Sequence, residues 1–105
     1  MIATLIRFQY GSDFSEDRVR QVAQGARGMF EGMPGLRSKA FTVDAGEREA
    51  FNFYVWETEE AAKAFFSPEV MDRIITYYGV KPTLQYSQVL ELVDNAHEGS
   101  RAAVR

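Results

Sequence analysis

Three side chains with hydrogen-bonding tips alternate along residues 49–57, in the stretch EAFNFYVWE. They are Asn52, Tyr54 and Trp56, and apolar residues stand between them. The β-branched and aromatic composition predicts a strand, in which residues two positions apart share a face. The amide, the phenol and the indole therefore point to the same side, and each is a neutral hydrogen-bond donor. This spacing suits either a ligand cavity or a core strand whose polar tips bond to neighbouring groups.

Aromatic side chains that follow this strand are candidates for the wall of such a cavity. Phe65, Phe66 and Tyr78 lie in a predicted helical region, and aromatic walls suit a flat, apolar ligand. The same residues are equally typical of a hydrophobic core. Arg37 and Lys39 are interpreted as solvated or paired at strand edges, with Arg37 as the candidate to bind an anionic substrate group.

The elements that would position these side chains follow in the order βαββαβ. Expected strands cover residues 2–10, 36–43, 49–57 and 80–93. Ser15 and Thr58 are predicted N-caps of two helical segments, and Ser67 with Pro68 restarts the second one. This order predicts an α+β, ferredoxin-like fold, with one four-stranded antiparallel sheet and two helices on one face.

Glycines and a proline predict finer details of these elements. Gly25 and Gly28 stand inside the first helix, where close packing against the sheet is one reason to keep them. Gly46 is available for a positive φ in the hairpin between the second and third strands. Pro82 cannot donate to a ladder, so the last strand is expected to begin at a sheet edge.

The predicted sheet has an apolar face that the helices leave uncovered. Phe51, Phe53 and Val55 oppose the three polar-tipped residues on the third strand. A large exposed apolar face is normally covered, so we expect a two-fold symmetric homodimer. We expect a single domain over residues 1–94 and a partly mobile tail at 95–105, which holds the single histidine, His97.

Composition excludes several classes of function. A net charge of −3 without a basic cluster argues against a nucleic-acid partner. The absence of cysteine removes disulfides and thiolate sites, and it suits a reducing cytoplasm. No apolar run has the length of a membrane span, and no signal peptide is indicated. No metal-ligand set and no glycine-rich phosphate loop is found, so no metal, nucleotide or flavin cofactor is expected.

The run FYVWETEEAAKAFF followed by SPE, with MPGL before the second strand and VLELVDN near the end, resembles the dimeric α+β barrel superfamily. The likeness covers about residues 2–94 and is strongest to small mono-oxygenases, including the antibiotic-biosynthesis and quinol mono-oxygenases. An Asn four residues before a Trp is similar to the pair in cofactor-free, anthrone-type enzymes. The resemblance implies that Asn52 and Trp56 donate to a developing oxyanion, while Tyr54 donates or relays a proton.

The chain departs from the family pattern at one position. Many relatives carry a helix histidine nine residues after the Trp, where this chain has Phe65. A haem needs an axial ligand, so haem chemistry is not expected. The missing histidine leaves no obvious general base, and a buried carboxylate, Tyr54 or an already ionised substrate would have to serve.

The resemblance therefore favours a cofactor-independent mono-oxygenase that acts with O₂ on a small aromatic, quinol-like or polyketide-like compound. Two alternatives remain open on the same scaffold, because one fold hosts many activities. One is an isomerase or cyclase. The other is a non-catalytic homodimer that binds a small apolar ligand or has a stress-related role.

Overall fold

The structure, a computed structural model, describes residues 1–95. Its strands are β1 (Ile2–Gln9), β2 (Leu36–Asp44), β3 (Glu49–Trp56) and β4 (Thr83–Gln88). Its helices are α1 (Glu16–Phe30), α2 (Glu59–Phe65) and α3 (Pro68–Tyr78). The predicted ferredoxin-like α+β fold is confirmed. Apart from its first residue, the tail expected at 95–105, which includes His97, lies outside the described residues.

Each helix begins at the hydroxyl side chain that the sequence indicates. Ser15, Thr58 and Ser67 each accept a hydrogen bond from the backbone N–H three residues later, at 3.2, 3.1 and 3.2 Å. Such a cap stabilises a helix by about 1 kcal/mol. Pro68 occupies the first position of α3, and Gly79 ends that helix in the left-handed conformation with φ of 81°.

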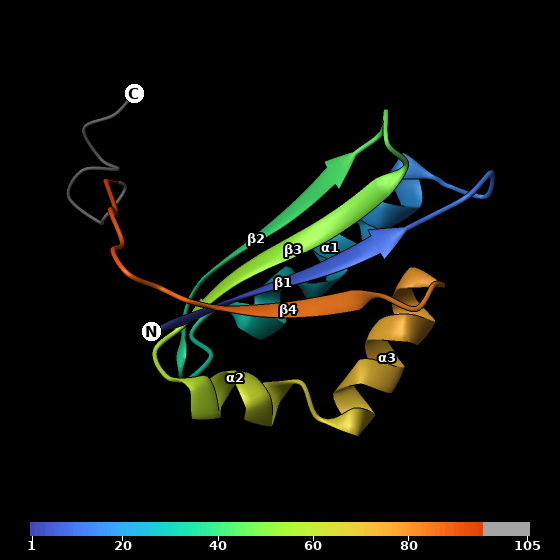
Figure 1. Cartoon of the computed structure of the whole chain (residues 1–105). Helices are drawn as coiled ribbons and strands as arrows, with labels where there is room; N and C mark the ends of the chain where they lie inside the picture. The colour runs from blue at the N-terminus through green and yellow to red at the C-terminus, as the bar shows by residue number, and fades with distance from the viewer. Residues whose placement is uncertain (96–105) are drawn as a thin grey trace.

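The four strands form one antiparallel sheet in the order β2-β3-β1-β4. Figure 1 shows the helices on one side of this sheet. Thr4 pairs with Tyr54 and Ile6 with Asn52, so these alternate residues of the two central strands share a face. That face is buried against the helices, which gives the chain its core. None of the described helices is long and apolar enough to span a membrane.

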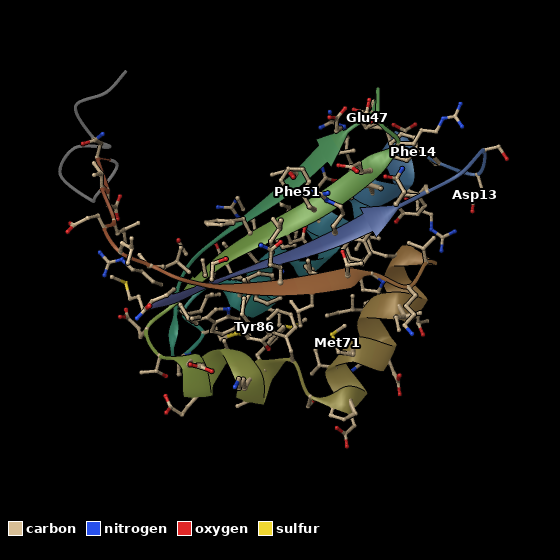
Figure 2. The ribbon with its side chains drawn as sticks, viewed as in Figure 1. Asp13, Phe14, Glu47, Phe51, Met71 and Tyr86 are labelled. Atoms are coloured by element: carbon tan, nitrogen blue, oxygen red, sulfur yellow. The ribbon has the colours of Figure 1, made fainter. Side chains whose placement is uncertain are left out.

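The opposite face of the sheet is apolar and partly uncovered. Phe53 is 43% exposed, and Leu5, its partner on β1, is half-buried. Figure 2 shows Phe51 on the side of β3 away from the helices, whereas Tyr86 lies between β4 and the helices. The guanidinium of Arg7 lies 5.8 Å from the centre of the Phe51 ring. We refer to Leu5, Phe51 and Phe53 as the outer apolar patch.

The last strand is shorter than the sequence predicts. β4 ends at Gln88 instead of continuing to residue 93. The physical reason is the register, because Gln88 pairs with Ile2, the first residue of β1. Beyond it only one ladder-like contact remains, in which the Val89 N–H donates to the Met1 carbonyl at 3.2 Å. Within residues 1–95 no strand lies beside the mostly apolar stretch 89–93, so it joins no ladder there.

Two expectations about glycines were wrong. A Cβ added to Gly25 or Gly28 would meet no atom within 4 Å, so close packing does not explain either residue. In the β2–β3 hairpin, the positive φ belongs to Arg48, at 53°, and not to Gly46. Close approach instead occurs at Gly35, where φ is 84° and an added Cβ would lie 2.8 Å from the Cβ of Ala61.

Candidate functional site

Asn52 and Tyr78 connect the sheet to the last helix inside the core. The Asn52 Nδ2–H donates to the Tyr78 hydroxyl at 3.0 Å, and both side chains are buried. The Tyr78 ring stacks on Phe8 with ring centres 3.8 Å apart, and its backbone carbonyl accepts from the Tyr10 hydroxyl at 2.7 Å. These contacts fix the Asn52 amide. Its nitrogen carries two hydrogens, of which the bond to Tyr78 uses one.

Tyr54 lies on the same face of β3 as Asn52 and is 1% exposed. Its ring stacks on Trp56 with centres 5.5 Å apart and meets the ring of Phe66 edge to face at 5.2 Å. Burial raises the pKa of Tyr54, nearby Tyr78 raises it further, and hydrogen bonding to Asn52 offsets a part. Burial also raises the pKa of Tyr78. Both phenols therefore stay protonated at neutral pH and act as neutral groups.

Lys39 lies among aromatic rings beside these residues. Its Nζ is 3.3 Å from the centre of the Phe30 ring, 4.1 Å from that of Phe41 and 4.4 Å from that of Tyr54. None of the ion pairs formed within residues 1–95 includes Lys39. Burial lowers the pKa of Lys39 to about 7, because an apolar environment disfavours the charged form. The interpretation of Lys39 as a solvated edge residue was therefore wrong.

A β-bulge explains why this lysine points inward. Leu36 pairs with Trp56 and Ser38 with Val55, which leaves Arg37 as an extra residue of β2. A bulge places two residues of one strand opposite one residue of its partner. Leu36 and Lys39, three positions apart, consequently both face the helices, and Lys39 stands directly opposite Tyr54 in the register.

A cavity of about 140 Å³ brings these polar groups together. It lies between β2 and β3 on one side and α1 and α3 on the other. Most of its wall is apolar and includes Phe30, Phe41, Phe65 and Ile74. Its lining also includes four buried or half-buried residues with polar tips, which are Lys39, Asn52, Tyr54 and Tyr78. An apolar enclosure with a few polar groups is typical of a small-molecule site.

The cavity opens to solvent between α1 and α3. Three of its lining residues are exposed, namely Met29 on α1 and Arg73 and Tyr77 on α3. No carboxylate lines the cavity, and Arg73 belongs to none of the ion pairs formed within residues 1–95. The entrance and the interior therefore each carry a basic group without an acidic partner, which favours an anionic or acidic ligand.

Three candidate residues lie apart from the cavity. Trp56 does not line it, and its Nε1–H donates to the Thr4 hydroxyl at 3.0 Å within the core. Phe66 is buried behind Tyr54 and also lies outside the lining. Arg37 lines a neighbouring surface hollow that shares Phe30, Lys39 and Phe41 with the cavity. The expectation that Trp56 lines the cavity together with Asn52 and Tyr54 therefore differs from the structure.

The sequence contains a signal for the inward direction of Lys39. Lys39, Phe41 and Val43 alternate with small or polar residues along β2, and two of the three are apolar. Counting back from the hairpin places all three on the inner face. Counting forward from Leu36 in steps of two places Lys39 on the outer face of the sheet, because this count does not allow for the extra residue of the bulge. Arg73 carried no comparable signal, since exposed arginines are common on helices.

Neither a protein-family model nor a curated protein matches the chain. Solved structures do match over most of its length. One is a mutant form of SnoaB, a cofactor-independent oxygenase from Streptomyces nogalater, with a TM-score of 0.64, 12% identity, and coverage of 88% of this chain and 95% of that one. Another is a monooxygenase from the gene ActVA-Orf6 of Streptomyces coelicolor in complex with nanaomycin D, with a TM-score of 0.64, 14% identity, and coverage of 88% and 89%.

A third match is a dimeric ferredoxin-like protein of unknown function from Thermobifida fusca, with a TM-score of 0.65, 16% identity, and coverage of 84% and 90%. The chain has the ferredoxin-like fold of these proteins. At such low identity the likeness concerns the fold. The function of this ferredoxin-like chain must be argued from its own cavity.

Proposed function

We propose that this protein is a cofactor-independent mono-oxygenase that uses O₂ to oxidise a small phenol, quinol or enol. The observation that carries the proposal is the set of four buried or half-buried polar residues, Lys39, Asn52, Tyr54 and Tyr78, in a cavity with a mostly apolar wall. This arrangement suits a flat substrate with one or two oxygen atoms. The fold shared with a cofactor-independent oxygenase and with a monooxygenase adds support.

The chemistry can proceed without a resident cofactor when the substrate itself supplies the electrons. The ionised substrate transfers one electron to O₂, and the resulting radical pair combines into a peroxide with a new C–O bond. Loss of water from the peroxide carbon, which still carries its hydrogen, then leaves a carbonyl, so that a phenol with a free ring C–H and O₂ give a quinone and H₂O. The protein has to hold the ring, stabilise the substrate oxyanion and exclude water.

The neutral hydrogen-bond donors in the cavity are suited to stabilising the substrate oxyanion. The amide of Asn52 and the phenol groups of Tyr54 and Tyr78 suit the binding of a substrate oxyanion. Trp56 has a different part in this proposal. Its indole N–H already binds Thr4, so it supports Tyr54 by stacking and donates nothing to the substrate.

The size of the cavity narrows the class of substrate. Sites for drug-sized ligands usually enclose about 300–1,000 Å³, whereas this cavity has about 140 Å³. A compound with one or two rings fits this volume better than a polycyclic one. We therefore place simple quinols, catechols and naphthols ahead of larger polyketides.

Oxygen uptake by the purified protein tests the proposal. Quinols, catechols and naphthols are supplied in turn, with a metal chelator present and the uncatalysed oxidation subtracted. Uptake that persists with the chelator is expected for at least one of them. Ala26→Leu, which fills the cavity from α1, should abolish it, and Ala64→Leu on the exposed side of α2 should not. Uptake that is equal in all three proteins, or absent throughout, would refute the proposal.

We further propose that the protein is a homodimer in which the outer apolar patch of one copy covers that of the other. The partly exposed Phe53 and the half-buried Leu5 and Phe51 support this arrangement. So do Leu90 and Val93 after β4, which are 87% and 80% exposed. Leu5 pairs with Phe53 across the two central strands and Phe51 follows on the same face, so these residues form one continuous patch, which is typical of an interface.

A further inference from the structure

The cavity contains a primary amine, and no carboxylate of residues 1–95 lines the cavity or pairs with this amine. The Nζ of Lys39 faces three aromatic rings on its cavity side, and the side chain is half-buried. Burying a lysine cation without a counter-ion is energetically unfavourable, so such a residue readily adopts its neutral form. A neutral amine is a base, and it lies in the cavity beside the neutral donors Asn52 and Tyr54.

We propose that the Lys39 amine accepts the proton of the substrate hydroxyl, and that the cavity selects phenols and enols acidic enough to release it. This rests on the proposed function. In the step, the lone pair of Nζ forms a new N–H bond, the substrate O–H bond breaks, and its electron pair stays on the substrate oxygen. An ammonium and a phenolate or enolate result, held together in the cavity. The ammonium later returns the proton to the peroxide.

The groups around Lys39 favour this direction of transfer. Besides Lys39, the charged and titratable residues that line the cavity and the adjoining hollow are Arg37 on β2, Tyr54 on β3, Arg27 on α1, Glu31 at the C-cap of α1, and Arg73, Tyr77 and Tyr78 on α3. Glu31 pairs with Arg27 at 3.4 Å on the surface, so the one carboxylate is already engaged. Arg37 and Arg73 belong to no ion pair formed within residues 1–95. The Arg73 guanidinium at the entrance favours an anion in the filled cavity.

Two opposing influences suit Lys39 to accept and then hold a proton. Burial favours the neutral amine and lowers the pKa of Lys39 to about 7. The faces of Phe30, Phe41 and Tyr54 favour the ammonium, because a ring face attracts a cation. A base works best when its pKa lies near the working pH. Once the substrate is ionised, the new anion adds to the attraction and keeps the ammonium in place.

The titration of the free protein provides the first test. Lysine side chains labelled with ¹³C at Cε are followed by NMR as the pH is raised, and Lys39→Arg identifies the Lys39 signal by its loss. A midpoint near 7 for Lys39 alone is expected, while the exposed Lys63 titrates far higher. If Lys39 keeps its proton until the pH at which Lys63 loses its own, the proposal is overturned. The titration itself is recorded on the wild-type protein, and Lys39→Arg serves only to assign the signal.

Binding of 3-nitrophenol provides the second test, at a pH between the pKa of Lys39 and that of the phenol. The anion of this one-ring phenol absorbs at longer wavelength than the neutral form, and calorimetry in two buffers counts the protons released. In the wild type we expect the anion spectrum with no proton released, because Lys39 keeps the proton. In Lys39→Arg, whose guanidinium cannot accept a proton, the anion spectrum should come with release of one proton.

Each outcome of these experiments either supports Lys39 as the base or rules it out. The anion spectrum with one proton released by the wild type would show that Lys39 is already an ammonium, and a neutral spectrum would show that no transfer occurs; either result overturns the proposal. If the wild type ionises the bound phenol but takes up no oxygen with any substrate, Lys39 is still supported as the base, and the proposed oxygenase activity is refuted. If uptake is found, Lys39→Met should lower kcat by about 10²- to 10⁴-fold, and Lys63→Met should leave it unchanged. If Lys39→Met takes up oxygen at the wild-type rate, the proposed oxygenase activity is supported and Lys39 is ruled out as its base.

Discussion

Lys39 and Tyr54 stand directly opposite each other on β2 and β3, with the lysine Nζ 4.4 Å from the centre of the tyrosine ring. Cross-strand neighbours on one face are the closest side-chain pairs in a sheet. The pair places a basic amine against the buried phenol that also stacks on Trp56. Burial lowers the pKa of Lys39 and raises that of Tyr54, so near neutral pH the amine is the one of the two that can accept a proton.

Lys39→Met should change how stability depends on pH. An unfolded chain protonates lysine below a pKa of about 10.4, whereas burial lowers the pKa of Lys39 in the folded protein to about 7. Between these values the unfolded chain binds more protons, so the free energy of unfolding of the wild type rises with pH. Relative to Lys39→Met, the rise should reach at most about 1.4 kcal/mol for each pH unit.

Urea unfolding at several pH values between neutrality and the onset of tyrosine ionisation measures this difference. Lys39→Met should be the more stable protein at the low end of the range, because it buries no charge. The advantage should shrink as the pH rises. Lys63→Met replaces an exposed lysine and should give a profile parallel to that of the wild type. A parallel profile for Lys39→Met as well would contradict the burial argument.

Alanine at Gly25 or Gly28 should stabilise the protein. Both residues lie inside α1, and an added Cβ at either would meet no atom within 4 Å. Glycine within a helix costs about 0.8–1 kcal/mol relative to alanine. Gly35→Ala should destabilise, because φ there is 84° and the new Cβ would lie 2.8 Å from Ala61. Thermal unfolding of the three variants tests this, and a lower midpoint for either helix variant would contradict it.

Trp56→Phe should reduce stability more than turnover. The substitution removes the N–H that donates to Thr4 at 3.0 Å and leaves a buried hydroxyl unpaired, at a cost of about 1–3 kcal/mol. Adding Thr4→Val should recover a part of that loss, because both ends of the hydrogen bond are then apolar. Urea unfolding of the two single variants and the double variant measures the coupling. Turnover that falls about 10²-fold or more with unchanged stability would instead favour a donor role for Trp56.

Truncation tests the proposed homodimer. Removing residues 94–105 should leave the assembly intact, whereas removing residues 89–105 should weaken it, because the second deletion takes away the exposed apolar residues after β4. Sedimentation at micromolar protein gives the mass of each form. Phe53→Lys in the outer apolar patch should also shift the mass towards the monomer. A monomeric wild type, or two truncations with equal dimer stability, would contradict the arrangement.

The order of elements could be predicted because its signals are local. Ser15, Thr58 and Ser67 are followed by helical periodicity, and period-two alternation marks β1 and β3. These signals depend on residues within one turn or one strand of each other. The position at which β4 ends depends instead on a residue far away in the sequence. Residues 89–93 have strand-like composition, but β1 begins at Ile2 and offers them no partner.

The candidate site could be predicted only in part, for a similar reason. Period two placed Asn52 and Tyr54 on one face, and both line the cavity. The partner that takes up the Trp56 N–H is Thr4, 52 positions away in the chain, and no sequence spacing indicates it. The inward direction of Lys39 depends on a bulge at Arg37, which alternation alone does not reveal.

The helices cover one side of the sheet (Figure 1), the outer apolar patch lies on the other side, where Figure 2 shows Phe51, and the cavity opens between α1 and α3. A partner seated on the outer patch would therefore neither contribute to a cavity nor obstruct one. Each chain would saturate independently, with hyperbolic kinetics and one ligand per subunit. Dilution that separates the subunits would leave the specific activity unchanged for as long as each chain stays folded.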